Sequence, residues 1–169
     1  MQAKSRSVLA LLAEPGVLAG GLAALGIGLL LGAFGFEYFG IKPCHLCLGQ
    51  RLPWPFMAIV AGIAMLGVRR GAPAMLAPAA FVLAALIALW SAYLAGFHAG
   101  VEWHWWEGPA SCTGTSAGAG LSFNPGEIIR CDAVAWSLFG LSLAGYNFIF
   151  SAVALAAAVT GARQTLRMR

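Results

Sequence analysis

The sequence predicts an all-α membrane protein, a four-transmembrane-helix bundle with two cysteine-bearing loops outside the cytoplasm. The first observation is composition: of 169 residues, 60% are hydrophobic and only 9% are charged, and the mean hydropathy is +0.82. One compact water-soluble core could not cover that much apolar surface. The second is a set of four long apolar runs, and the third is a one-sided distribution of Lys and Arg between them.

The four runs belong to a single integral membrane domain that we expect to cover residues 1–169. The first run, of about 21 residues, reaches roughly 31 Å as a helix, enough to cross a hydrocarbon core. It is too long for the apolar segment of a cleaved signal peptide, so we expect it to be retained. The second run is short and begins with Pro53 and Pro55, which predict a bent or interfacial first turn. The expected spans are approximately 16–36, 52–68, 74–97 and 134–160.

Basic residues set the expected orientation. Seven of the ten Lys and Arg residues precede span one, join spans two and three, or follow span four. By the positive-inside rule these segments and both termini are cytoplasmic, and the loops 37–51 and 98–133 are extracytoplasmic. The net charge of +4 is therefore explained by topology, and no basic stripe interleaved with aromatics indicates a nucleic-acid partner.

All four cysteines fall in the two extracytoplasmic loops, where disulfides form and persist. Cys44 and Cys47 form a Cys-x-x-Cys motif preceded by Pro43, which suits the first turn of a helix. A helix N-terminus lowers the pKa of a thiol by favouring the thiolate, the nucleophile in disulfide exchange. If the helix continues, Arg51 shares a face with both cysteines and can stabilise a thiolate or a quinone oxygen. The alternative for Arg51 is an interfacial arginine.

Other uses of these thiols are weighed by spacing. A c-type haem site needs His directly after the second cysteine, but Leu48 follows Cys47. A zinc site with the histidines lacks a second closely spaced cysteine pair, so we expect no metal. A purely structural Cys-x-x-Cys bridge closes too small a loop to stabilise the fold much by chain entropy. The spacing favours a redox relay by disulfide exchange toward a lipid-soluble electron carrier.

The second loop carries Cys112 in a Gly, Ser, Thr and Ala-rich segment, residues 108–120, which predicts a mobile and accessible thiol. Cys131 stands directly before span four, after residues 123–130 that predict a turn and a short interfacial helix. Trp103, Trp105 and Trp106 are expected interfacial anchors. His98, near the end of span three, is either a donor to a bound quinone or a boundary histidine without a catalytic role.

Over essentially the whole chain these features resemble the disulfide bond formation protein B (DsbB) family, quinone-dependent oxidants of the periplasmic thiol oxidase DsbA. The resemblance rests on the four spans, Pro43-Cys44-His45-Leu46-Cys47 with Arg51, the separated pair Cys112 and Cys131, and Gly140-Leu-Ser-Leu. It implies that Cys44 and Cys47 are the quinone-linked pair, that Cys112 forms the mixed disulfide with the partner, and that Cys131 resolves it. Arg51, and by position His98, would bind the quinone.

The resemblance implies a membrane thiol:quinone oxidoreductase that reoxidises a periplasmic DsbA-type partner and passes electrons to the membrane quinone pool, with ubiquinone as the expected quinone. The expected location is the bacterial inner membrane. Gln50, the prolines after Arg51 and the second-loop length depart from the best-known family pattern, which puts local geometry and partner choice in question. Alternatives are a homologue dedicated to one secreted substrate, a reductive conduit, a membrane metal-binding or transport protein, and a span bundle with two inert disulfides.

Overall fold

The computed structural model describes residues 13–70, 75–113 and 129–168. Lys4, Arg6 and most of the segment expected to form a turn and interfacial helix, residues 123–128, lie outside these ranges. Four helices are long and apolar enough to cross a membrane, as the composition predicts. The elements are α2 Pro15–Tyr38, α3 His45–Gly49, α4 Pro53–Arg70, α5 Leu76–Glu102, β1 Ser137–Leu138, β2 Leu141–Ser142 and α6 Leu143–Arg167.

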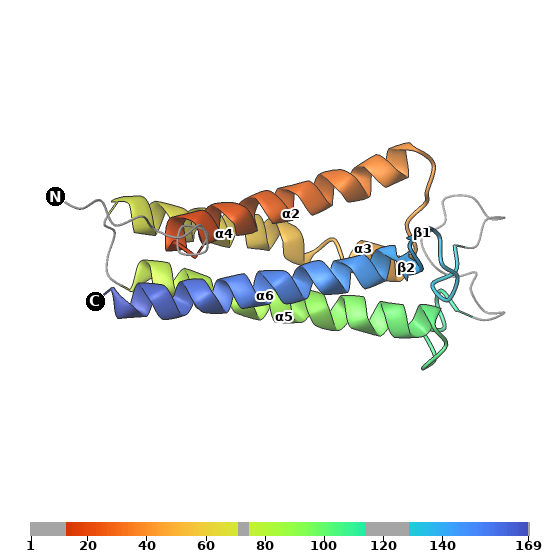
Figure 1. The fold of residues 1–169 in the computed structure, drawn as a ribbon. Coiled ribbons are helices and arrows are strands. Elements are labelled where there is room, and N and C mark those ends of the chain that lie inside the picture. The colour runs from red at the N-terminus through yellow and green to blue at the C-terminus, as the bar shows by residue number, and fades with distance from the viewer. Residues whose placement is uncertain (1–12, 71–74, 114–128, 169) are drawn as a thin grey trace.

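The four long helices run side by side in one bundle (Figure 1). The start of α2, the end of α4, the start of α5 and the end of α6 lie at one end. The short helix α3, the two strands and the cysteine-bearing segments lie at the other end (Figure 1). Helix α2 diverges from α6 toward its Tyr38 end (Figure 1). Within the described ranges, the short helix and the two strands therefore lie at the end where the sequence places the cysteines.

The start of the fourth helix differs from the sequence-based expectation. Helix α6 begins at Leu143 instead of residue 134, because Ser137–Leu138 and Leu141–Ser142 pair as a two-residue antiparallel hairpin. Phe139 and Gly140 form its turn at φ 51° and φ 80°, a backbone conformation that ends a helix. Ser142 then caps α6, with its side chain accepting a hydrogen bond from the Gly145 N–H. The apolar run was continuous, so hydropathy alone could not reveal this break.

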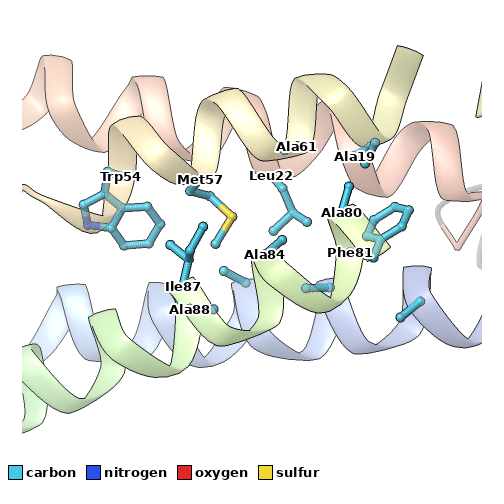
Figure 2. Packing of buried hydrophobic residues seen from close by; sticks show 14 residues of the cluster. Ala19, Leu22, Trp54, Met57, Ala61, Ala80, Phe81, Ala84, Ile87 and Ala88 are labelled. Carbon is cyan, nitrogen blue, oxygen red and sulfur yellow. The ribbon is translucent and has the colours of Figure 1, made fainter. Parts of the chain in front are cut away.

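Alanines and a few larger side chains form the core between the four helices. Trp54 lies at one end of this cluster and Phe81 near the other (Figure 2). Alanines at the contacts allow helices to approach closely without the cavities that mismatched larger side chains leave. The buried members are Ala19, Leu22, Trp54, Met57, Ala61, Ala64, Ala80, Phe81, Ala84, Ile87, Ala88, Ala154, Ala158 and Ala162.

Two glycines mark the closest helix approaches. A β-carbon at Gly26 would lie 2.8 Å from the Trp54 carbonyl oxygen, so α2 and α4 meet there backbone to backbone. A β-carbon at Gly161 would overlap the Phe81 ring. The regularly spaced pair Gly28 and Gly32, in contrast, has open space around both positions. The face of α2 that α4 covers therefore decides which glycine of this helix lies at the closest contact.

Candidate functional site

Cys44 and Cys47 meet at the start of α3. Cys44 is the residue that caps this helix, and its Sγ accepts a hydrogen bond from the Cys47 N–H at 3.1 Å. The two sulfurs lie 2.7 Å apart as free thiols. Pro43 precedes the helix instead of forming part of its first turn, so that detail of the expectation is wrong.

The lowered pKa expected for a thiol at this helix N-terminus is also not what the structure gives for Cys44. The hydrogen bond to the Cys47 sulfur, followed by burial, raises the pKa of the Cys44 thiol well above its usual range. Cys44 is only 4% exposed, so little water is available to solvate a charged form. The helix N-terminus therefore does not by itself make Cys44 the acidic member of the pair. The 2.7 Å contact joins the two sulfurs, and either of them can be its donor.

Cys112 and Cys131 form a disulfide with a Cα–Cα distance of 5.3 Å. The Cys131 N–H also donates to the Cys112 carbonyl at 2.7 Å, which joins the two segments by backbone as well as by sulfur. Cys112 is 3% exposed and Cys131 is fully buried. The expectation of an accessible Cys112 is thus wrong for this disulfide-bonded form, because the bond draws Cys112 into the protein against Cys131.

The two cysteine pairs share one buried cluster. Cys44, Cys112 and Cys131 pack together with Val101 of α5, and Cys47 borders the same cluster. Cys44 and Cys131 are 87 positions apart in the numbering, so only the bundle brings them together. This packing places the sulfurs of the two loops in one environment, where disulfide exchange between them is geometrically reasonable.

Arg51 does not continue the cysteine helix. Helix α3 ends at Gly49, and Arg51 lies in the turn before α4, so the expected single face at i, i+3 and i+7 is wrong. The guanidinium pairs with Glu37 at 2.7 Å, donates to the Ala33 carbonyl at 3.4 Å and lies 5.1 Å from the centre of the Phe34 ring. These contacts anchor it to the end of α2. It nevertheless lines the same cavity as both cysteines.

His98 connects α5 to the cysteine helix. Its Nε2 lies 3.6 Å from Cys44 Sγ, and its Nδ1 lies 2.5 Å from the side-chain nitrogen of Gln50. Nε2 also lies 3.8 Å from a carboxylate oxygen of Glu102, one helical turn away. With 3% exposure, His98 is a buried member of the site and not a histidine at a wet boundary.

Two polar residues at the site, Glu102 and Asn147, are absent from the sequence-based expectations. Glu102 accepts a hydrogen bond from the Ser142 hydroxyl, and Asn147 donates to the Gln50 side-chain oxygen at 2.6 Å. Glu102 could have been found from its i+4 spacing to His98, which places both on one helix face. Asn147 had no such signal, since the expected fourth span treated it as one polar residue in an apolar run.

A cavity of about 330 Å³ lies beside the cysteines. Both Cys44 and Cys47 line it, together with His98, Glu102 and Arg51. The rest of its wall is mostly apolar and comes from α2, α4, α6 and the hairpin, including Gly28, Gly32, Ala33, Phe36, Trp54, Leu138, Ala144 and Phe150. An apolar cavity with a few convergent polar groups is the usual form of a small-molecule site.

The metal-binding alternative involves side chains of this same site. Among the described residues, the ligand atoms of Cys44, Cys47 and His98 lie within 4.8 Å of one another. Thiolates and imidazole are ligands that suit zinc. The proximity of these three atoms is therefore compatible with a metal site as well as with a redox site.

The tryptophans after α5 gather on the surface near the second loop. Trp103, Trp105 and Trp106 are all exposed, and the Trp106 indole N–H donates to the Phe97 carbonyl at 2.9 Å. Trp106 also stacks on the Phe97 ring, with centroids 6.1 Å apart. Their role as interfacial anchors stays a prediction.

Comparison with family models matches residues 16–161 to the model described as disulfide bond formation protein DsbB. The chain belongs to the DsbB family. The match covers all four long helices nearly completely and every one of the four cysteines. Comparisons with curated proteins and with solved structures found no match.

Membership in the DsbB family makes this chain a helical, multi-pass membrane protein of disulfide bond formation. It implies, in general terms, a disulfide-forming oxidoreductase activity. DsbB proteins are in general linked to a quinone and to a thiol oxidase partner.

Proposed function

We propose that this protein is a membrane thiol:quinone oxidoreductase that reoxidises a periplasmic DsbA-type thiol oxidase and passes the electrons to a quinone, with ubiquinone the expected quinone. The observation that carries the proposal is the common location of both cysteine pairs and the apolar cavity. Cys44 belongs to the buried cluster of Cys112 and Cys131 and also lines the cavity with Cys47. One pair thus touches both the other pair and a site for a lipid-soluble acceptor.

The exchange begins at the second-loop disulfide. A thiolate of the reduced partner attacks Cys112 Sγ, the Cys112–Cys131 bond breaks, and Cys131 leaves as a thiolate. The second partner thiol then displaces Cys112, which releases the partner with its own disulfide restored. Because Cys112 is only 3% exposed in the disulfide-bonded form, this attack requires local rearrangement around it.

The loop dithiol is next oxidised by the Cys-x-x-Cys pair. One loop thiolate attacks the Cys44–Cys47 disulfide, and the second completes the transfer, leaving Cys44 and Cys47 as thiols. The free thiols at Cys44 and Cys47 beside an intact Cys112–Cys131 disulfide correspond to this stage. Two electrons and two protons then leave the Cys44 and Cys47 pair, which returns it to a disulfide.

The cavity fits a quinone in size, polarity and donors. Its volume of about 330 Å³ lies within the range of small-molecule sites, and its wall is mainly apolar, with Arg51 as a hydrogen-bond donor and His98 beside the cysteines. When bound, a quinone supplies a two-electron, two-proton acceptor. Residues of both α2 and α6 form its wall, so the cavity lies between membrane-spanning helices, where a lipid-soluble ring would bind.

The energetics favour such an acceptor. DsbA-type oxidants lie near −120 mV, about 150 mV above thioredoxin, a difference of roughly 7 kcal/mol for two electrons. Ordinary thiol pools cannot reoxidise a partner with that potential. The basic ends of the helices support a cytoplasmic side opposite the cysteines, and so a periplasmic location for the cysteine end at a bacterial inner membrane. Residues Arg69, Arg70 and Arg167 all lie at the end opposite the cysteines.

The test is optical quinone reduction by purified protein mixed with reduced DsbA-type partner. Turnover that needs the partner and disappears in both Cys44→Ser and Cys112→Ser supports the proposal. Single-turnover mixing separates the steps, since Cys44→Ser should still form a mixed disulfide with the partner whereas Cys112→Ser should not. Zinc bound in stoichiometric amount with no quinone reduction would favour the metal-binding alternative and contradict the proposal.

A further inference from the structure

A chain of side-chain hydrogen bonds crosses the bundle from α4 to the cysteines. Trp54 Nε1 lies 3.1 Å from Asn147 Oδ1 on α6. Asn147 Nδ2 lies 2.6 Å from Gln50 Oε1, and Gln50 Nε2 lies 2.5 Å from His98 Nδ1. The other nitrogen of that imidazole, Nε2, lies 3.6 Å from Cys44 Sγ. The chain therefore ends at the redox-active motif.

The direction of every bond in this chain follows from its first member. An indole N–H can only donate, so the atom of Asn147 that faces Trp54 must be the carbonyl oxygen. The Asn147 amide group then donates to the Gln50 oxygen, which leaves the Gln50 amide group to donate to His98 Nδ1. A neutral imidazole has one proton, and with Nδ1 accepting, that proton is on Nε2.

The surroundings of His98 agree with this assignment. Cys44 Sγ, a Glu102 carboxylate oxygen at 3.8 Å and the backbone carbonyl of Cys131 face the ring, and all three can accept. Cys47 is the other titratable group close by, with its sulfur within 4.8 Å of Nε2. A second ring proton would lie on Nδ1 and point at the Gln50 N–H, so two donors would face each other. Because His98 is only 3% exposed, water is not available to accept from either one.

We infer that Trp54, Asn147 and Gln50 are positioning residues that hold His98 as its neutral Nε2–H tautomer, so that His98 donates a hydrogen bond to Cys44 Sγ. Held in this way, His98 is a fixed hydrogen-bond donor and not a base, because its only free lone pair is already used by Gln50. No proton is transferred. The donated bond favours negative charge on Cys44 when exchange releases that sulfur. This role in exchange rests on the proposed function, whereas the tautomer does not.

The test is nitrogen NMR of protein labelled with ¹⁵N-histidine, reduced at Cys44 and Cys47 and free of quinone and partner. The chain has three histidines, and a His98→Asn variant assigns the resonance. We expect the proton on Nε2 throughout about pH 5 to 8, the range where an imidazole ordinarily titrates. In Gln50→Glu a carboxylate oxygen replaces the amide N–H that faces Nδ1, so we expect the proton on Nδ1 or on both nitrogens.

Two further variants keep the result decisive. Asn147→Leu frees the Gln50 amide to rotate and should give a mixture of both tautomers, which covers the case that Gln50→Glu fails to fold. Phe148→Leu, at the next and exposed position of α6, should leave His98 as in the unsubstituted protein. A proton on Nδ1 of unsubstituted His98, or no change in a folded Gln50→Glu protein, overturns the inference. Either outcome can occur with quinone reduction intact, so it is distinguishable from failure of the proposed function.

Discussion

The middle of the bundle and its cysteine end differ in the kind of side chain that is buried. In the middle, alanines dominate the buried positions, and the buried hydroxyls of Ser91 and Ser151 bond to one another and to a helix carbonyl. At the cysteine end, the buried groups are an imidazole, a carboxylate and an amide that join different elements: His98, Glu102 and Gln50.

This difference separates the residues that stabilise the bundle from those that would take part in its chemistry. Small apolar side chains stabilise the bundle by close packing, which tolerates no added volume at the tight contacts. Polar groups taken from water must be hydrogen-bonded, and a linked set of them specifies one arrangement of the elements that it joins. Changes at the cysteine end should therefore alter redox behaviour with the bundle intact, and changes in the middle should do the reverse.

The largest expected effect is the loss of quinone reduction in Cys47→Ser. The variant lacks one of the two sulfurs of the cavity-lining pair, so that pair can no longer cycle between dithiol and disulfide. We expect no turnover by the optical assay, together with an unchanged thermal unfolding temperature and a normal Cys112–Cys131 disulfide. Substantial turnover in this variant would remove the cavity-lining pair from the pathway.

The next effect is expected at Arg51. Arg51→Ala should raise the quinone KM about 10- to 100-fold, the amount expected when one charge-assisted hydrogen bond is lost. Exchange with the partner should be unaffected, as followed by mixed-disulfide formation. The matched control is Glu37→Gln, which removes the 2.7 Å ion pair but leaves the guanidinium in place. An equal KM increase in both variants would show that Arg51 acts only by anchoring α2.

A stability effect is expected where α2 and α4 approach each other most closely. Gly26→Ala forces a β-carbon to within 2.8 Å of the Trp54 carbonyl, so we expect a loss of about 1–3 kcal/mol in stability. Gly28→Ala, two residues along the same helix, meets nothing within 4 Å and should be neutral or slightly stabilising. Thermal unfolding in detergent measures the pair, and equal stabilities would contradict the close approach of α2 and α4.

The smallest effect concerns pH at the second loop. The side-chain hydrogen bond from Arg130, at 2.9 Å to one oxygen, holds the pKa of Asp132 below its usual value. A lowered folded-state pKa contributes stability above the ordinary Asp value, near pH 4, and that contribution is lost as the pH falls further. Asp132→Asn should abolish this acid sensitivity, measured as the rate at which tris(2-carboxyethyl)phosphine, a reductant that stays active in acid, reduces the Cys112–Cys131 bond. The same acid dependence in both proteins would exclude the pair as its cause.

The sequence by itself determined the membrane class, the four long helices and the polar breaks that carry the cysteines. Those features depend on local hydropathy, helix length and composition, which need no knowledge of neighbours. It also determined the Cys-x-x-Cys motif and the proximity of Arg51 to it along the chain. The helix continuing to Arg51 and the start of the fourth helix at residue 134 were wrong, since a turn and a hairpin interrupt runs whose hydropathy shows no interruption.

Only the tertiary structure decided what surrounds the sulfurs. His98 reaches Cys44 across 54 positions, Asn147 reaches Gln50 across 97, and Ser142 reaches Glu102 across 40. Cys112 becomes buried because its disulfide partner lies against the Cys44 cluster. The physical reason is that a buried polar group must find its partner wherever the packed helices place one, and that position depends on how the helices rotate and cross. Apolar periodicity predicts that helices pack, but not which polar atoms the packing brings into contact.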